Sequence, residues 1–447
     1  MLIKIRFTLI HMKALLSTVI FCLLSFYCYS QSRDLEKIIM QLDTMSDGPV
    51  QGRFKNNVLA FSGEVVSGKM SGQWLFWSKR GIIKSNSSYE NGKKEGTEYL
   101  YDEKGRMLSE SNFISGLLDG IYIEYYEFLR PALTGFYKQG KKDSTWTEYF
   151  PDGTISFIQN FQSNLKHGRQ TYYYPNQQIS RSESYTYGIK SKQWTYYHDN
   201  GTRSKVFNYE KGLIEGIYEE FYPNGTKSSK GAYEFGLKSG IWLNFYENNQ
   251  LYSMGSYRHN EKSGIWKYFT KKGSIDYEGL YEHDLKIGQW VYYYTNGSLE
   301  SIGSYLNDEK HGLWGFFYPN NQIKQEQTWQ QGKLLEVSDF YSMKGKLLFK
   351  GNLKNGNGSY FEYYPEGEIK LKASLQNGLF SELYKGYHIN NKLAFEGKMV
   401  LGLRQGLWSF YHLNGNISAT GCYLNSEKVG QWKEYSKYGR LLKTLKY

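Results

Sequence analysis

Aromatic and glycine residues recur along this chain at a fixed interval of 24 residues. The pattern reads Gly-x-Trp-x-x-Tyr-Tyr-x-Asn-Gly and occurs sixteen times, with one interval shortened to 22 residues between Ser338 and Tyr360. A fixed short period predicts a repeat architecture in which neighbouring units bury one another's hydrophobic side chains. We take the Trp position as the anchor of each repeat, and nine repeats have Trp there: Trp74, Trp146, Trp194, Trp242, Trp266, Trp290, Trp314, Trp408 and Trp432.

Other columns keep the same phase as the anchor. All sixteen repeats have an aromatic residue three positions after it, eleven have Gly seven positions after it, and twelve have Gly two positions before it. Chance does not align four columns in this way, so we predict sixteen copies of one structural unit. The remaining anchors are Tyr122, Tyr218, Tyr360 and Tyr384, with Glu98, Gln170 and Ser338 as non-aromatic exceptions.

One repeat predicts two short strands and two turns. An aromatic run from Gly216 meets Pro223-Asn224-Gly225, in which Pro presets φ for a type I turn and Gly takes the left-handed position that closes a hairpin. A more polar strand and a second turn follow. The fold class is therefore all-β, an elongated single-chain stack of about sixteen 24-residue β-hairpin repeats. The anchor and the aromatic three positions later lie on opposite faces of a regular strand, so either a bulge intervenes or both faces are partly covered.

Three regions are expected along the chain. Residues 1–30 combine basic residues with a short apolar run and predict a signal peptide, so we expect export to the periplasm, the cell surface or the medium. Residues 31–62 form an N-terminal helix or linker cap, because Leu35, Ile38, Ile39 and Leu42 have helical spacing. Residues 63–447 form the repeat array, which is irregular around 330–358.

The repeat resembles the MORN repeat in its bacterial variant form. The resemblance lies in Phe221-Tyr222-Pro223-Asn224-Gly225, followed by Tyr233 and by the segment Gly236-Leu237-Lys238-Ser239-Gly240-Ile241-Trp242. It extends over roughly 85% of the chain. The resemblance implies stacked β-hairpins that act as scaffolds or membrane-associated modules, in a branch often labelled antitoxin-like. It implies no chemical activity.

Enzymatic chemistry is not expected from the side chains. The histidines fall in repeat columns, as His198, His388 and His412 do, and a shared column spreads residues along an array instead of gathering them at one site. Removal of the signal peptide would leave Cys422 as the single cysteine, and no pair of residues has metal-ligand spacing. Neither a nucleophile elbow nor a phosphate-binding loop occurs. We therefore expect no catalytic residue, no metal and no cofactor.

A basic column is the candidate ligand strip. The chain has a net charge of +12, which permits binding to anionic polymers or membrane surfaces without requiring it. Stacked repeats would align the column along the ribbon, where it either tracks an anionic surface or forms a solvated turn whose lysines deter aggregation. It occupies the position four before the anchor in ten repeats: Lys94, Lys142, Lys166, Lys190, Lys238, Lys262, Lys286, Lys310, Arg404 and Lys428.

Three functions are compatible with these patterns. The first is a non-catalytic exported scaffold that mediates protein–protein interaction at the cell envelope, and an exposed apolar stripe would distinguish it. The second is a binding module for an anionic glycan or lipid surface through the basic column. The third is an antitoxin-like inhibitor of a partner toxin. Nucleic acid is not an expected partner of an exported protein.

Overall fold

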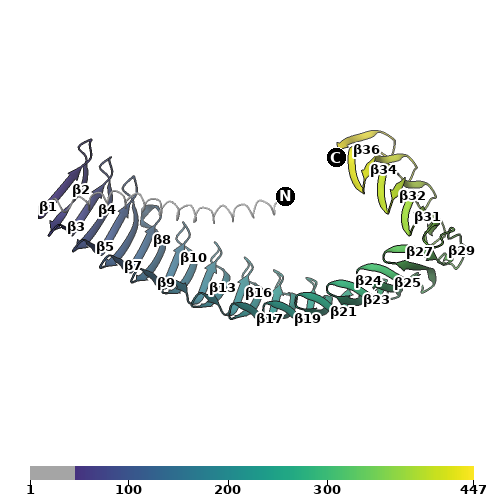
Figure 1. Ribbon diagram of the computed structural model, residues 1–447, viewed down its shortest axis with the longest axis horizontal. Coiled ribbons are helices and arrows are strands. Elements are labelled where there is room, and N and C mark those ends of the chain that lie inside the picture. Colours follow the sequence, from purple (N-terminus) through teal and green to yellow (C-terminus); the bar gives the residue numbers. More distant parts are fainter. Residues whose placement is uncertain (1–45) are drawn as a thin grey trace. The chain divides into compact units, whose positions relative to one another are not determined.

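The computed structural model describes residues 46–447, which form an all-β protein of two compact units. Unit 1 extends to Gly201, and unit 2 comprises Thr202–Tyr447. In both units successive antiparallel strands stack one beside the next, as Figure 1 shows. The predicted signal peptide and the helical part of the predicted cap, residues 34–45, lie outside the described residues. The remainder of that cap segment contains β1 and the start of β2, so strands begin before residue 63.

Unit 1 consists of consecutive antiparallel strands and one short 3-10 turn, η1. The elements are β1 (Gly48–Arg53), β2 (Leu59–Val66), β3 (Lys69–Trp77), β4 (Ile83–Glu90), β5 (Lys93–Tyr101), β6 (Met107–Ile114), β7 (Leu117–Tyr125), η1 (Glu127–Leu129), β8 (Pro131–Lys138), β9 (Lys141–Tyr149), β10 (Ile155–Gln162), β11 (Leu165–Lys166), β12 (Gly168–Tyr173), β13 (Ile179–Thr186), β14 (Ile189–Lys190) and β15 (Lys192–Tyr197).

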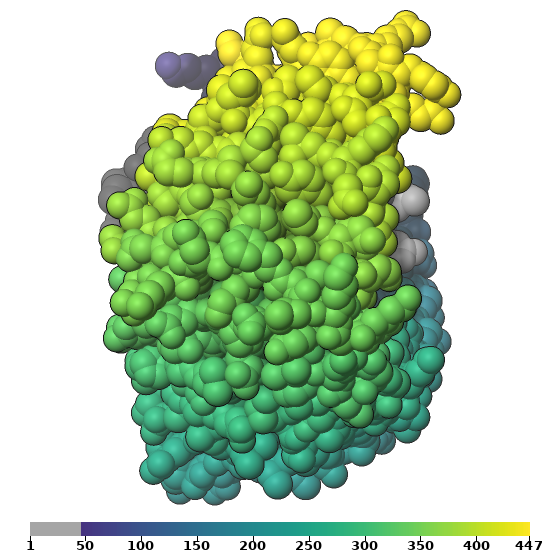
Figure 2. Space-filling view, turned by 90° about the vertical axis from the view of Figure 1, so that its right-hand side faces the viewer, coloured from purple at the N-terminus to yellow at the C-terminus, as the bar shows by residue number. Residues whose placement is uncertain are grey.

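Unit 2 continues the same pattern and ends in an eight-stranded sheet, β30–β37. Figure 2 shows the surface over its C-terminal strands in green to yellow. The strands are β16 (Arg203–Glu210), β17 (Leu213–Phe221), β18 (Lys227–Glu234), β19 (Leu237–Phe245), β20 (Leu251–Arg258), β21 (Glu261–Phe269), β22 (Ile275–Glu282), β23 (Leu285–Tyr293), β24 (Leu299–Leu306), β25 (Glu309–Phe317), β26 (Ile323–Gln330), β27 (Lys333–Val337), β28 (Phe340–Tyr341), β29 (Leu347–Leu348), β30 (Gly358–Tyr363), β31 (Ile369–Gln376), β32 (Leu379–Tyr387), β33 (Leu393–Val400), β34 (Leu403–Tyr411), β35 (Ile417–Leu424), β36 (Glu427–Tyr435) and β37 (Leu441–Lys446).

The Pro-Asn-Gly turn forms as the sequence predicts. Gly225 N donates to Tyr222 O at 2.9 Å, Tyr222 N donates to Thr226 O at 2.8 Å, and Gly225 has φ of +86°. These are the features of a type I turn closed by a left-handed residue. The strand register shifts at the same point, between Glu220 and Phe221. The predicted hairpin geometry is therefore confirmed.

The second turn of each repeat has two chemical forms, both with two successive residues at positive φ. One form ends in Gly, as in Phe235-Gly236, and the other ends in Asn or Asp, as in His259-Asn260, or in Ser, at Ser426. In the second form the Asn260 Oδ1 accepts a hydrogen bond at 2.6 Å from the backbone N of Lys238 in the preceding repeat. Paired positive φ values define the type I′ turn, which Gly, Asn and Asp tolerate best. Either form therefore reverses the chain between neighbouring strands.

A β-bulge interrupts the regular repeats just before the anchor. Opposite Gly255 in β20, strand β21 places the three residues Gly264, Ile265 and Trp266, because Met254 pairs with Lys267 and Ser256 pairs with Ser263. Gly264 has φ of +76°, a value that suits glycine. This explains the column of glycines two positions before the anchor. The bulge also sets the direction of the two residues that follow the glycine.

Side-chain ladders connect each repeat to the next along the edges of the sheet. A tyrosine four positions after the anchor donates its hydroxyl to a backbone carbonyl of the next repeat, as Tyr246 does to Phe269 O at 2.9 Å. His388 and His412 fill the same position, and their Nε2 atoms contact Tyr411 O and Tyr435 O at 3.0 and 2.9 Å. The shared histidine column therefore belongs to this ladder.

Candidate binding surfaces

The anchor tryptophans lie flat against the neighbouring strand. Gly279 pairs with Trp290 across β22 and β23, and a Cβ atom added to Gly279 would lie 2.2 Å from the indole ring. The indole Nε1 donates to Leu280 O at 3.2 Å, beside the register shift of the bulge. All nine anchor tryptophans make this bond to the carbonyl ten residues earlier, at 2.9–3.2 Å. Each ring therefore covers a strand and satisfies a carbonyl at the bulge.

Tyrosine rings separate the tryptophans along this face. In unit 2 Tyr281 lies between Trp266 and Trp290, with ring centroids at 6.2 and 5.0 Å and near-perpendicular planes. Edge-to-face packing of this kind suits the charge distribution of aromatic rings. Trp266 and Trp290 are 1% and 0% exposed although the sheet has no second layer of strands over this face. The aromatic columns predicted as anchors thus form the core of each unit.

Non-aromatic anchors replace the ring with polar bonds. Gln170, which is fully buried, donates from Nε2 to Asn160 O at 2.9 Å and accepts from Asn160 N at 3.1 Å. Asn160 O is the carbonyl that a tryptophan at this position would contact. Glu98 instead accepts from Ser87 Oγ at 2.8 Å and pairs with Lys94 at 2.5 Å. These substitutions keep the buried polar groups of the bulge bonded.

The predicted basic column lies over the aromatic face. Eight of its ten members are 4.0–5.2 Å from a ring centroid of their own anchor tryptophan: Lys142, Lys190, Lys238, Lys262, Lys286, Lys310, Arg404 and Lys428. In the two repeats with polar anchors, Lys94 pairs with Glu98, and Lys166 Nζ donates to Tyr172 OH at 3.2 Å. A cation over an indole is attracted by the ring quadrupole. The column is therefore part of the packing of this face.

Burial lowers the pKa of four of these lysines. Desolvation lowers the pKa of Lys142, Lys238, Lys286 and Lys310 below the ordinary value for lysine. Nearby carboxylates act in the opposite direction at three of them, as Asp308 does at Lys286. The side chains are half-buried, so the column is neither a fully solvated turn nor a row of free ammonium groups. Binding of an anionic ligand by this column remains a prediction.

The opposite face carries the aromatic residues three positions after the anchor. Tyr293 OH donates to Glu278 Oε1 at 3.1 Å. Glu278 precedes Gly279, which lies under Trp290, and neighbouring residues of a strand point to opposite faces. Tyr293 is therefore on the face away from the tryptophans. Of the two explanations left open by the sequence, the second holds: the bulge lies before the anchor, Tyr293 lies on the face opposite Trp290, and each face is partly covered.

An aliphatic row is exposed on this second face of unit 2. It occupies the position before the anchor, at the centre of the bulge, where the side chain is pushed outward. Ile217, Ile241, Ile265 and Leu313 are 58–64% exposed, whereas the tryptophans beside the last three are buried. Gln289 fills the same position in the fourth of these five repeats. We call these five residues the aliphatic row.

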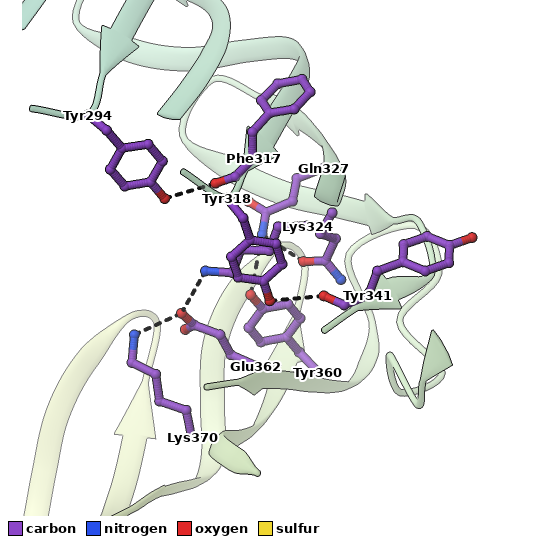
Figure 3. Close-up of polar contacts among 10 residues, drawn as sticks. Tyr294, Phe317, Tyr318, Lys324, Gln327, Tyr341, Tyr360, Glu362 and Lys370 are labelled. Atoms are coloured by element: carbon purple, nitrogen blue, oxygen red, sulfur yellow. Dashed lines mark hydrogen bonds and ion pairs between the residues drawn. The ribbon is translucent and has the colours of Figure 1, made fainter. Parts of the chain in front are cut away.

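A polar cluster replaces the regular pattern where the repeat with the Ser338 anchor departs from it. Glu362 of β30 contacts Lys370 at 2.9 Å and Lys324 of β26 at 3.8 Å, and Gln327 Nε2 donates to Tyr360 OH at 3.3 Å (Figure 3). Desolvation lowers the pKa of Lys324. The cluster links β26 to β30 through side chains where β27 is cut short. Because its polar side chains bond to one another, we interpret the cluster as a structural connection between β26 and β30.

Other candidate chemistry is sparse in the described part of the chain. Within residues 46–447, no group of three or more His, Cys, Asp or Glu is placed to hold a metal ion. In that same range, no helix has the length and apolar character needed to cross a membrane. A shallow hollow on the second face of β32–β34 is lined by Leu383 and Leu407 and by the ion pairs Lys385–Glu396 and Lys398–Glu382. It holds no constellation suited to catalysis.

Comparison with known families identifies the repeat. A family model described as the MORN repeat variant matches five segments, all in unit 2, at residues 214–234, 238–259, 286–307, 310–331 and 404–425. The predicted resemblance is confirmed at these repeats. No curated protein matches the chain.

The solved structures that match this chain include distant ones. They include the TcdB2-TccC3-Cdc42 complex, TcdB2-TccC3 without its hypervariable C-terminal region, and the Photorhabdus luminescens Tc holotoxin pore, at 10%, 10% and 9% identity. The alignments cover 89%, 89% and 86% of this chain but 27%, 26% and 26% of those chains, each with a TM-score of 0.14. This chain thus spans about a quarter of the length of the solved chains it matches. A TM-score this low indicates no shared arrangement and has no bearing on function.

Proposed function

We propose that this chain, which carries MORN repeat variants, is an exported, non-catalytic scaffold that binds a protein partner along the sheet face opposite its tryptophans. The observation that supports this proposal is the aliphatic row of unit 2. Four of its five members expose more than half of their surface to water. Apolar surface gains about 25 cal/mol for each Å² removed from water, so an ordered row of this kind favours a covering partner.

The basic column gives less support to the alternative of an anionic glycan or lipid ligand. Its ammonium groups already lie on indole rings, and desolvation disfavours their charge. A ligand phosphate or carboxylate would have to compete with these ring contacts and with carboxylates such as Asp308. Among residues 46–447 the aliphatic members of the row have no comparable intramolecular partner, because their side chains are more than half exposed. A protein surface is therefore the partner that the exposed groups fit better.

Export is part of the proposal and is supported by the residue pattern at positions 1–30. Fractionation of cells that produce the full chain tests it directly. We expect the protein outside the cytoplasm, shortened at its N-terminus. Recovery of the full-length chain in the cytoplasm alone would remove this part of the proposal.

The binding proposal is tested by capture from envelope extract at low and high salt. The bait is the full chain, and the comparison variant carries Ile241→Glu and Ile265→Glu. We expect capture of a defined protein that persists at high salt and is lost in the variant, because a charge cannot be buried in an apolar contact. The matched control is Phe235→Glu, which places the same charge on an exposed apolar turn residue outside the aliphatic row and leaves capture intact.

Two outcomes would redirect the assignment. Capture that survives Ile241→Glu would place the interface elsewhere. Capture that disappears with salt and with Glu in place of Lys238, Lys262, Lys286 and Lys310 would support the anionic-ligand function instead. Since these lysines also pack on tryptophans, far-UV circular dichroism must show that the variants remain folded.

A further inference from the structure

Large and small side chains alternate from strand to strand on the face that bears the aliphatic row. Each row member pairs across the sheet with a residue of the next strand, as Ile241 does with Ser256 and Ile217 does with Ala232. From β17 to β26 the sequence of side chains is Ile217, Ala232, Ile241, Ser256, Ile265, Leu280, Gln289, Ser304, Leu313 and Thr328. Along this row, a strand with a large exposed residue is thus usually flanked by strands with smaller residues.

Between β19 and β24, a second row on the same face is symmetric about β21 and β22. Its cross-strand pairs, in strand order, are Leu243–Met254, Lys267–Glu278 and Val291–Ile302. The central pair is an ion pair at 2.9 Å. Two apolar pairs therefore flank one pair of opposite charges.

We propose that a second copy of this chain covers this face, related by a two-fold axis that lies parallel to the strands between β21 and β22. Such an axis reverses the order of the strands and keeps each row opposite itself. It places Ile241 against Ser304 of the partner subunit, and Leu313 against Ala232 of the partner subunit. On either side of the centre, large side chains of one copy then meet smaller ones of the other, as in the close packing of two sheets face to face. At the centre, Ile265 meets Leu280 of the partner subunit in an apolar contact.

The charges on the face agree with the same axis. Lys267 faces Glu278 of the partner subunit, and Glu278 faces Lys267 of the partner subunit, so opposite charges meet twice at the centre. Leu243 faces Ile302 of the partner subunit, which continues the apolar contact on both sides of the ion pairs. Like charges opposed at this position would cost stability. From β19 to β24 the arrangement therefore satisfies shape and charge with one operation. Farther out, Glu219 of β17 faces Glu326 of the partner subunit, and Lys227 already pairs with Glu219 at 2.9 Å.

Periodicity is the reason for choosing a second copy over another protein. The exposed row repeats with the spacing of the sheet hairpins over five repeats, so a partner that meets every member needs the same spacing. A second copy of this chain has the same spacing, because it has the same 24-residue repeats. The inference rests on the proposed function, which assigns this face to a protein contact, and adds the identity of the partner.

Cysteine cross-linking tests the predicted register. In full-length protein with Ser in place of its native cysteines, one variant carries Ile241→Cys and another carries Ser304→Cys. Mixed under mild oxidation, they are expected to form a disulfide-linked heterodimer much faster than either variant alone. The control mixture replaces Ser304→Cys by Ser256→Cys, a residue of similar exposure one strand from Ile241. Equal cross-linking in both mixtures, or none with Ser304→Cys, would overturn the inference.

Sedimentation equilibrium separates failure of this inference from failure of the proposed function. We expect twice the single-chain mass for the full chain, and the single-chain mass for the Ile241→Glu, Ile265→Glu variant with an unchanged circular dichroism spectrum. A monomeric wild-type chain that still captures an envelope protein through Ile241 would refute self-association and leave the scaffold proposal standing. A dimeric wild-type chain that captures no envelope protein would support self-association and refute capture of a different protein by the scaffold.

Discussion

At the scale of single residues, the anchor and the residue across from it are matched to each other. Glycine stands eleven positions before the anchor in eight of the nine repeats with Trp and in none of the seven others. In those eight repeats a Cβ atom on the glycine would lie 2.1–2.3 Å from the indole. The exception is Trp194, which follows Glu183 at this spacing. An indole ring at the anchor thus leaves no room for a side chain at the position eleven residues earlier.

An added methyl group in a packed core typically costs about 1–3 kcal/mol of stability. We therefore expect Gly255→Ala to destabilise unit 2 by more than this. The Cβ would lie 2.1 Å from the Trp266 ring, which is 1% exposed. The matched rescue is Gly255→Ala with Trp266→Tyr, which reproduces the natural pair Ala373 and Tyr384. Hydrogen exchange of β20 and β21 measures the local effect. Equal protection in the single and double variants would contradict the steric explanation.

Buried tyrosines predict a loss of stability at alkaline pH. Burial raises the pKa of Tyr268, Tyr277 and Tyr318 from 10.0 to about 12. Between these values the unfolded chain has released protons that the folded chain retains, so the free energy of unfolding falls as pH rises from 10 to 12. Lysines such as Lys286 act in the opposite sense at lower pH, because their lowered pKa lets the folded chain release protons first.

Denaturant unfolding at intervals from pH 8 to pH 12 measures this dependence. We expect the decline to begin near pH 10 and to be shallower in Tyr268→Phe, which removes one titrating group. The comparison with wild type uses the slope of the free energy of unfolding against pH, since loss of the hydroxyl also changes stability at pH 8. A flat profile up to pH 12 would rule out the linkage.

At the scale of elements, the sequence is a good guide to turns and strands and a poor guide to what joins repeats. The Pro-Asn-Gly motif predicts the first turn because its residues have strong local preferences. The contact between Tyr246 and Phe269 O joins residues of different repeats, so no local preference reveals it. The same holds for Lys286, whose position over Trp290 follows from a bulge that cannot be read from alternation alone.

The tyrosine ladder can be tested within its own column. Tyr246→Phe removes the hydroxyl that donates to Phe269 O, and we expect a loss of about 1 kcal/mol, the usual net value of such a bond. Tyr246→His should lose less, because His388 makes the equivalent contact at 3.0 Å. Unfolding midpoints in denaturant compare the three proteins. A histidine variant weaker than the phenylalanine variant would show that ring packing outweighs the hydrogen bond.

At the scale of the whole molecule, repetition makes the fold predictable from one unit. Sixteen anchors in phase are enough to predict an all-β stack, because each repeat needs its neighbours to bury its rings. The interval shortened to 22 residues marks the place where β27 is cut short and polar side chains connect β26 to β30. The geometry of that connection depends on Gln327, Tyr360 and Glu362, whose contacts cross more than 30 positions of the chain.

Repetition also predicts that a full period can be removed without loss of the fold. Deletion of residues 286–309, which is one period, joins Leu285 to Lys310 and restores the Leu-Lys sequence found at Leu285-Lys286. The tryptophan that follows the junction then still meets a glycine, since Gly279 comes to stand eleven positions before Trp314. We expect cooperative unfolding with stability lowered by about one repeat interface. Deletion of residues 286–297, half a period, removes β23 and leaves consecutive strands with the wrong direction, so unit 2 should lose its near-ultraviolet dichroism. Equal folding of the two deletion proteins would mean that the 24-residue period does not govern the structure.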